Sequence, residues 1–120
     1  MKVQRKCGHG FVEAEGENHA ELWEQLAKLE EAFGETTCGK CNGEELRHVV
    51  RENSDGDKFY ELHCLNSKCR SKLRMSVRKK GGAFFPKRRA SEKDATGLES
   101  GTYLPHRGWM RYNKETGKEE

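Results

Sequence analysis

Two closely spaced pairs of cysteines constrain the fold of this chain more than any other feature. Two residues separate Cys38 from Cys41, and four separate Cys64 from Cys69. A pair at either spacing can form a loop that presents two sulfurs to one ion, and Zn²⁺ prefers four such ligands in a tetrahedron. The residues between the pairs, 42–63, are enough for a hairpin. The pattern predicts a structural Zn²⁺ ion in a zinc ribbon, with these four cysteines as its ligands.

Other interpretations of the cysteines fit less well. Disulfides suit a short secreted chain, but residues 1–12 contain no apolar run and therefore do not resemble a secretion signal. Catalytic zinc usually keeps three protein ligands and an open position. Iron in a four-thiolate site stays open, because tetrahedral sulfur sites accept either metal. His48 and His63 could substitute as ligands, although four thiolates already satisfy zinc.

A fifth cysteine stands apart from the two pairs. Cys7 lies two residues before His9, but two ligands are too few for a second metal site. We interpret Cys7 as an ordinary unpaired cysteine in a hairpin.

The composition predicts a small hydrophobic core. Of the 120 residues, 32% are hydrophobic and 36% are charged. We therefore expect zinc to replace part of the missing hydrophobic burial, and some of the chain to be disordered. No apolar stretch approaches the roughly 18 residues of a membrane span, which predicts no membrane partner. With reduced thiols and no targeting feature, the cytoplasm is the expected compartment.

The first third of the chain predicts a hairpin followed by a helix. Residues 2–6 and 11–15 are expected strands, joined by a glycine-rich turn. A helix is expected over residues 19–33, with Asn18 as its N-cap, Glu21 completing a capping box, and Gly34 closing it. Its apolar stripe, which we expect to pack on the protein's own core, consists of Leu22, Leu26, Leu29 and Phe33, widened by Trp23 and Ala27.

The middle of the chain predicts a three-stranded antiparallel sheet. Strands are expected at Leu46–Glu52 and Lys58–His63, with turn residues at 53–57 between them. A third strand, Ser71–Arg78, alternates strictly, so that one face is apolar and the other carries cations. The predicted fold class is α+β, with an N-terminal β-hairpin and one α-helix packed on a three-stranded antiparallel zinc ribbon.

Three segments follow from these patterns. Residues 1–36 form the hairpin and helix, residues 37–89 form the four-cysteine zinc ribbon with a basic strand and loop, and residues 90–120 form a polar, partly ordered C-terminal tail. We expect much of 90–102 and 114–120 to be mobile. An aromatic and apolar cluster interrupts this polarity and should dock on the protein or on a partner: Tyr103, Leu104, Trp109, Met110 and Tyr112.

Positive charge is concentrated in one short segment. The whole chain has a net charge of +3, but residues 70–90 contain nine Lys and Arg and no Asp or Glu. Cations along a strand can follow phosphates, and aromatic rings within a basic segment can stack on unpaired bases. The candidate nucleic-acid-binding residues are Arg70, Lys72, Arg74, Arg78, Lys79, Lys80, Phe84, Phe85, Lys87, Arg88 and Arg89.

Two alternatives to this interpretation stay open. The basic face could be a solvated one that pairs with the acidic helix at 19–33, because residues 1–36 carry eight Asp and Glu against four Lys and Arg. Phe84 and Phe85 could equally be core residues at the end of the sheet.

Enzyme signatures are absent from the sequence. It has no glycine-rich phosphate loop, no zinc-protease motif and no Cys/His pair in a recognisable catalytic setting. Asp55 and Asp57 suggest a Ca²⁺ loop, but no acid stands at the twelfth position that such a loop needs. The sequence therefore predicts a protein that is not an enzyme.

Several motifs resemble one family. Cys38-Gly39-Lys40-Cys41, Phe59 to Cys64, Cys69, and Arg78 to Arg88 are similar to small zinc-ribbon proteins encoded by bacteriophages and mobile elements, and Gly108 to Tyr112 fits the same ending. The resemblance covers residues 1–89 and 108–113, and residues 90–107 look like an insertion. It implies an association with single-stranded DNA and recombination, in the cytoplasm of a bacterial host cell.

The sequence thus favours a non-catalytic zinc-ribbon protein that binds nucleic acid, either single-stranded DNA or RNA, and that could be an accessory of phage DNA metabolism. The alternative is a protein–protein interaction adaptor, in which helix 19–33 or the Trp109 cluster docks on a larger protein.

Overall fold

The computed structural model describes residues 1–92 and 95–120, which form an α+β fold with one α-helix and several antiparallel sheets. The chain divides into two compact units. Unit 1 comprises residues 1–36 and 77–85, and unit 2 comprises residues 37–76 and 86–120. Within the described ranges, no helix combines the length and the apolar character needed to cross a bilayer. The coarse prediction, an α+β protein that begins with a β-hairpin, is confirmed.

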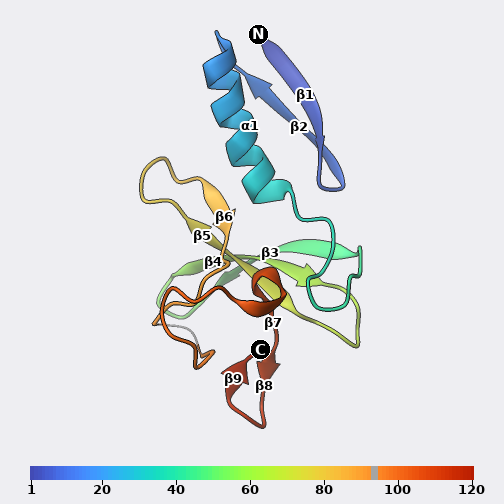
Figure 1. Ribbon diagram of the computed structural model, residues 1–120, viewed down its shortest axis with the longest axis vertical. Coiled ribbons are helices and arrows are strands. Elements are labelled where there is room, and N and C mark those ends of the chain that lie inside the picture. Colours follow the sequence, from blue (N-terminus) through green and yellow to red (C-terminus); the bar gives the residue numbers. More distant parts are fainter. Residues whose placement is uncertain (93–94) are drawn as a thin grey trace. The chain divides into compact units, whose positions relative to one another are not determined.

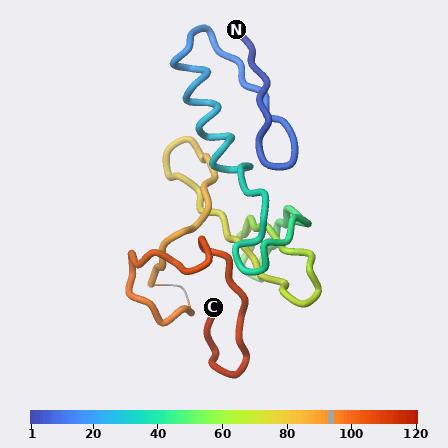
Figure 2. The backbone as a smooth tube through the Cα atoms, turned by 45° about the vertical axis from the view of Figure 1, so that its right-hand side comes forward, coloured from blue at the N-terminus to red at the C-terminus, as the bar shows by residue number. Residues whose placement is uncertain are grey.

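Unit 1 begins with a hairpin that lies along a helix. Strands β1 (Lys2–Cys7) and β2 (Gly10–Glu15) pair antiparallel. Helix α1 (His19–Phe33) lies beside them in both views (Figures 1 and 2). The turn needs glycine at position 8, where φ is +59° and an added Cβ would lie 2.3 Å from the carbonyl oxygen of Phe33. This close approach joins the hairpin turn to the end of the helix.

The start of α1 follows the predicted capping pattern with one difference. The Asn18 side chain accepts a hydrogen bond of 3.0 Å from the backbone N–H of Glu21. The Glu21 carboxylate, however, accepts from the N–H of Glu17 at 2.7 Å instead of from Asn18. Gly34 follows the helix as expected, but its φ of −80° is right-handed, so the helix does not end in a left-handed cap.

The apolar stripe of α1 is narrower than predicted. Leu22 is buried, together with Ala14 of β2, and Leu26 and Leu29 are half-buried. Trp23 is 77% exposed and Phe33 is 45% exposed. The prediction that Trp23 and Ala27 widen the buried stripe is therefore wrong, because a two-stranded hairpin covers only a narrow face of the helix.

Unit 2 contains the main sheet. Strands β3 (Leu46–Glu52), β4 (Lys58–Cys64) and β5 (Lys72–Val77) are antiparallel and adjacent, as predicted. Two short strands extend this sheet beside β5: β6 (Phe84–Pro86) and β7 (Trp109–Met110). Residues 77–85, at the tip of the β5–β6 hairpin, belong to unit 1. Strand β7 was not predicted, because two residues carry too little pattern to indicate a strand.

The turn between β3 and β4 has the chemistry that its sequence indicates. The Asn53 side chain accepts hydrogen bonds of 3.0 Å from the backbone N–H groups of Asp55 and Asp57. Gly56 takes a φ of +85°. These side-chain contacts fix the turn and hence the pairing of β3 with β4.

The last segment carries short elements as well as loops. A 3₁₀ helix, η1 (Pro105–Gly108), precedes β7, and strands β8 (Tyr112–Asn113) and β9 (Lys118–Glu119) form a second hairpin. Ala90, Leu104 and Met110 form a small buried hydrophobic cluster in this segment. The expected mobility of 90–102 and 114–120 stays a prediction, and residues 93 and 94 of that segment lie outside the described residues.

Candidate metal centre and cationic cavity

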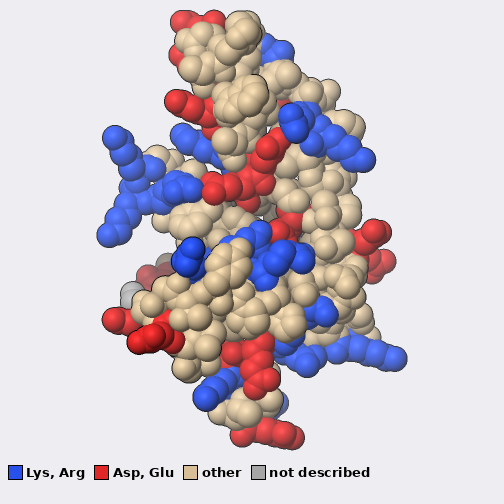
Figure 3. Space-filling model, in the orientation of Figure 1, with Lys and Arg blue, Asp and Glu red and all other residues tan. Residues whose placement is uncertain are grey.

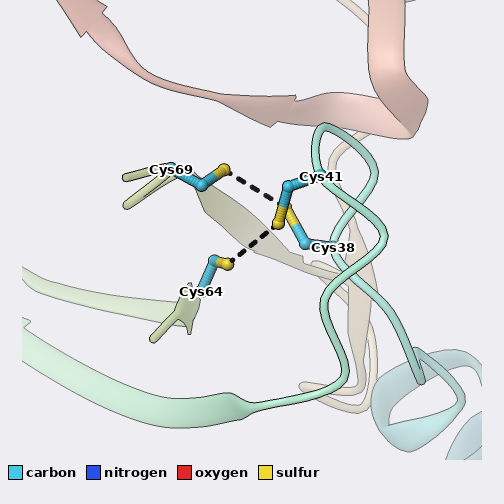
Figure 4. Close-up of side chains that lie close together, drawn as sticks. All are labelled: Cys38, Cys41, Cys64 and Cys69. Carbon is cyan, nitrogen blue, oxygen red and sulfur yellow. Dashed lines mark hydrogen bonds between the residues drawn. The ribbon is translucent and has the colours of Figure 1, made fainter. Parts of the chain in front are cut away.

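The structure brings the four predicted cysteine ligands together. Cys38 and Cys41 come from the loop before β3, Cys64 ends β4, and Cys69 lies in the loop before β5 (Figure 4). Their sulfur atoms all lie within 4.8 Å of one another. The Sγ atoms of Cys38 and Cys69 are 3.7 Å apart, and those of Cys41 and Cys64 are 3.5 Å apart.

These distances fit a single tetrahedral metal ion. Four sulfurs at the Zn–S distance of about 2.3 Å would stand about 3.8 Å from one another. The same distances exclude disulfides, whose sulfurs are about 2.0 Å apart, and all five cysteines are unpaired. The four cysteines could therefore bind a metal ion, and the disulfide alternative is wrong.

The first cysteine pair lies in a loop that folds around its sulfurs. The backbone N–H of Lys40 points to Cys38 Sγ at 3.4 Å, and the N–H of Gly43 points to Cys41 Sγ at 3.4 Å. Asn42 takes a φ of +61°, which reverses the chain after Cys41. Backbone donors aimed at sulfur stabilise thiolates, which are the form that binds a metal.

A buried serine hydroxyl contacts one cysteine of each pair. Ser71 is fully buried, and its Oγ lies 2.9 Å from Cys38 Sγ and 3.1 Å from Cys69 Sγ. This contact joins the two cysteine pairs. The sequence did not indicate it, because a serine two residues after a cysteine has no distinctive pattern.

The electrostatics of the cluster favour a cation. Burial raises the pKa of Cys64 to about 12. Burial also acts to raise the pKa of Cys69, but hydrogen bonds from Ser71 and the neighbouring thiols lower it to about 7. Ionising all four cysteines would bury charges that repel one another, and a divalent metal ion would offset this cost.

The hydrophobic core of unit 2 surrounds the sulfurs. Leu62, Leu73 and Trp109 form one buried cluster with Cys38, Cys64 and Cys69. Trp109 stands opposite Leu73 in the β5–β7 pairing, and both are completely buried. Trp109, one member of the cluster that was predicted to dock, therefore docks within unit 2. Its side chain is completely buried and leaves no exposed surface for a partner.

The other face of the same sheet carries cations. Lys72 and Arg74 alternate with Leu73 along β5, so their side chains leave the sheet on the side away from the sulfurs. They line a cavity of about 270 Å³ in unit 2. Six of its lining residues are basic: Arg70, Lys72, Arg74, Lys87, Arg111 and Lys114.

The cavity combines predicted and unpredicted residues. Four of the cations belong to the candidate set at 70–89, whereas Arg111 and Lys114 do not. Leu104 and Met110 provide apolar walls, and Tyr112 provides an aromatic ring that is 58% exposed. The sequence named Leu104, Met110 and Tyr112 as part of a cluster that should dock, but it did not indicate Arg111 or Lys114, which lie about 40 positions beyond β5 in a segment without periodicity.

The other predicted cations have partners elsewhere. In unit 1, Arg78 donates to the Glu31 carboxylate at 3.0 Å and lies over the Phe85 ring at 4.7 Å. For Arg78, the alternative of pairing with the acidic helix is therefore correct. In unit 2, Arg88 donates to a backbone carbonyl and Arg89 lies over the Tyr103 ring. Basic and acidic side chains lie close together over much of the face in Figure 3.

The remaining candidates of the basic segment lie near the hairpin tip. Lys79 and Lys80 are exposed, and Phe84 and Phe85 are half-buried. The two phenylalanines are thus neither fully buried in a core nor fully exposed for stacking.

A buried carboxylate organises the cationic face. Glu61 of β4 is 3% exposed and accepts two hydrogen bonds of 2.8 Å from Arg51, with a third contact of 2.8 Å to His63. Burial alone would raise the pKa of Glu61, but the hydrogen bonds with Arg51 and His63 lower it to about 2. His63 therefore contacts Glu61, and among the described residues the group of potential metal ligands contains cysteines and no histidine.

The Cys7-x-His9 pair does not form a metal site. His9 Nε2 lies 2.6 Å from the carbonyl oxygen of Thr36. Burial raises the pKa of Cys7, which keeps it a thiol. Among the described residues, no cluster of potential ligands includes this pair.

Comparisons of the chain with protein-family models, with curated proteins and with solved structures gave no match.

Proposed function

We propose that this protein is a non-catalytic zinc-ribbon protein that binds single-stranded nucleic acid through the cationic cavity of unit 2. The single observation that carries the proposal is the composition of the cavity. Six basic side chains line it together with apolar side chains and an exposed tyrosine. Cations attract the phosphates of any nucleic acid. The aromatic ring favours unpaired bases, whose faces are accessible for stacking.

Zinc is the metal that we propose for the four cysteines. A site with four thiolates suits Zn²⁺, and four protein ligands leave no open position for catalysis. In this proposal the ion is structural and completes a zinc ribbon, because it would fix Cys64 at the end of β4 and Cys69 just before β5. It would thereby fix the strand from which Lys72 and Arg74 reach the cavity.

The resemblance to zinc-ribbon proteins of bacteriophages and mobile elements suggests where this activity would be used. We propose phage DNA metabolism in the cytoplasm of a bacterial host as the setting, with single-stranded DNA as the partner.

The test is a titration of a fluorescent single-stranded oligonucleotide with the zinc-loaded full chain at two salt concentrations. The affinity should fall with salt by a slope of about −0.7 per contacted phosphate. The double variant Arg70→Gln with Lys114→Gln should weaken binding, because both side chains are exposed, line the cavity and form no side-chain hydrogen bond or ion pair with a described residue.

A matched variant controls for net charge. Lys6→Gln with Lys58→Gln removes the same two charges from exposed positions outside the cavity. If the two double variants lose affinity equally, binding is not localised to the cavity. If the unaltered protein fails to bind at low salt, the proposal is wrong.

A second candidate function has its own observation. Trp23 of α1 is 77% exposed and Phe11 of β2 is 71% exposed, which leaves large apolar side chains of unit 1 in solvent. Such side chains are typical of protein interfaces. An adaptor role predicts that Trp23→Ala abolishes partner binding that survives nuclease treatment, whereas the Arg70→Gln and Lys114→Gln variant retains it.

A further inference from the structure

One acidic side chain lies among the basic residues of the cavity. Glu119 of β9 is the single Asp or Glu among the described residues that line it. Its carboxylate accepts two hydrogen bonds from the Arg74 guanidinium, at 2.5 Å from Nη2 to Oε1 and 3.1 Å from Nη1 to Oε2. A guanidinium binds two oxygens of a phosphate with this same fork geometry. Glu119 therefore stands where a phosphate would bind.

Arg74 is held in place by a second acid at its rear. Its Nε lies 3.7 Å from Oε2 of Glu61, which is itself buried and hydrogen-bonded to Arg51. The guanidinium thus keeps its orientation if Glu119 moves away. An arginine fixed in this way is prepared to exchange one anion for another.

The Glu119 side chain is less constrained than its backbone. The backbone of β9 is fixed by its pairing with β8, by the hydrogen bond from the Glu119 N–H to Ala95 and by the reciprocal bonds of Glu120 with Arg111. The carboxylate, by contrast, has Arg74 as its one hydrogen-bonding partner among the described residues, so a rotation of the side chain can release the guanidinium without unfolding β9. The Glu119 side chain is also 16% exposed, so an incoming anion can reach its position from solvent.

The pairing of β8 with β9 also places an aromatic ring beside this anion position. Tyr112 lies directly opposite Glu119, so both side chains project from the same face. Directly opposite residues have Cβ atoms about 4.5–5.5 Å apart, and both Tyr112 and Glu119 line the cavity. The cavity of about 270 Å³ is just below the range of about 300–1,000 Å³ that is typical of drug-sized ligands.

We infer that the cavity is a site for one 5′-phosphorylated nucleotide, free or within a strand. The phosphate takes the position of the Glu119 carboxylate on Arg74, and the base stacks on Tyr112. Glu119 is then an internal counter-ion that competes with the ligand. This inference builds on the proposed function, because it names the unit of the strand that the cavity recognises.

The experiment measures calorimetric binding of four probes to the zinc-loaded full chain: inorganic phosphate, deoxyadenosine, deoxyadenosine 5′-monophosphate and a twelve-nucleotide adenine strand. We expect the monophosphate to bind at least tenfold more tightly than either phosphate or deoxyadenosine. Glu119→Gln should tighten binding of the monophosphate and of the strand about tenfold, because the competing charge is removed.

Two further variants separate this mechanism from general electrostatics. Glu115→Gln removes the same charge from the turn of the same hairpin but lies outside the cavity, so it should change affinity less than twofold. Tyr112→Leu should weaken the monophosphate about tenfold and leave phosphate unchanged, because stacking is lost and the cations remain.

The outcomes distinguish this inference from the proposed function. If Glu119→Gln and Glu115→Gln have equal effects, or if Tyr112→Leu leaves the monophosphate unaffected, the nucleotide site is wrong even where salt-dependent strand binding persists. If the monophosphate binds as expected and the strand does not bind, the nucleotide site holds and the proposed binding of strands is wrong.

Discussion

The two units obtain their order by different means. In unit 1, the buried hydrophobic residues among those described are Ala14 and Leu22, while Phe11 and Trp23 remain exposed. In unit 2, Leu73 and Trp109 are completely buried around a cluster of four sulfurs. Unit 1 relies on pairing and capping along a short hairpin and helix, whereas unit 2 is built around four close cysteines that could bind a metal ion.

This difference shows how a chain with 32% hydrophobic residues can still form a defined site. Burying one leucine contributes about 1.5–3 kcal/mol, but a structural zinc ion of the kind proposed for unit 2 would contribute about 10–16 kcal/mol near neutral pH. Where the sulfurs lie, the sheet can therefore use its opposite face for charged residues. Unit 1 has no such cluster among its described residues, and its most exposed apolar side chains are Trp23 at 77% and Phe11 at 71%.

The largest expected effect comes from removing the metal. A strong chelator should unfold unit 2 and leave much of unit 1 in place, because no cysteine of the cluster belongs to unit 1. Hydrogen exchange measured by mass spectrometry should show loss of protection in residues 58–75 and a smaller change in residues 19–33. Retained protection of β4 and β5 without metal would show that the two units do not differ in this way.

Truncating the central tryptophan should have the next largest effect. Trp109→Ala removes a completely buried side chain beside the sulfurs and should cost about 3–5 kcal/mol in the free energy of unfolding. Trp23→Ala is the matched change in unit 1, and it should cost less than about 0.5 kcal/mol because the side chain is largely exposed. Similar losses in urea unfolding of the two variants would contradict the comparison.

Substituting Glu61 should lower the stability by a smaller amount, without acting on the metal directly. Glu61→Gln removes the charge that holds Arg51 and orients Arg74, and it should cost about 2 kcal/mol at pH 7. The hydrogen bonds of Glu61 lower its pKa from 4.5 to about 2. Its stabilising contribution is therefore complete above pH 4.5 and is lost as the pH falls towards 2.

Carbon-detected NMR of the Glu61 carboxyl group checks this sign. While the protein remains folded, the group should stay ionised at every pH above 4.5, even where thiolate protonation begins to weaken metal binding. Protonation of Glu61 at or above pH 4.5 would contradict the assignment of its partners.

A smaller effect than that of Glu61 is expected at the helix cap of unit 1. Asn18→Ala removes the hydrogen bond from the Glu21 N–H and should cost about 1 kcal/mol. The loss should appear as faster hydrogen exchange in the first turn of α1, with no change in metal content. A change in the metal content of this variant would show that the metal site in unit 2 depends on the stability of unit 1, which would contradict the comparison.

Local patterns in the sequence predicted the elements but not the cavity. The periodicity of residues 19–33 and the alternation of residues 72–75 reflect local geometry, so the helix and the third strand were found, and the cysteine spacing indicated the cluster. Whether Trp23 is buried depends on the width of its packing partner, which periodicity does not encode. Likewise, Arg78 is engaged by Glu31, and only the folded chain places them together.

The cavity could not be predicted because the residues that line it are far apart in the sequence. Arg111 and Tyr112 join Arg70 and Lys72 there because β7 adds to the sheet beside β5. A two-residue strand leaves no period to detect, and Glu119 had no signal beyond its charge. The basic composition of residues 70–90 thus indicated a surface of the correct sign, and four of its cations meet in the cavity.

Native mass spectrometry of the chain mixed with a single-stranded oligonucleotide tests the central claim most directly, because it weighs metal and strand together. We expect one Zn²⁺ per chain in protein purified without added metal, and strand complexes formed only by the zinc-bound chain. Strand complexes of equal abundance with metal-free chain, or a folded chain that carries no metal, would contradict the account.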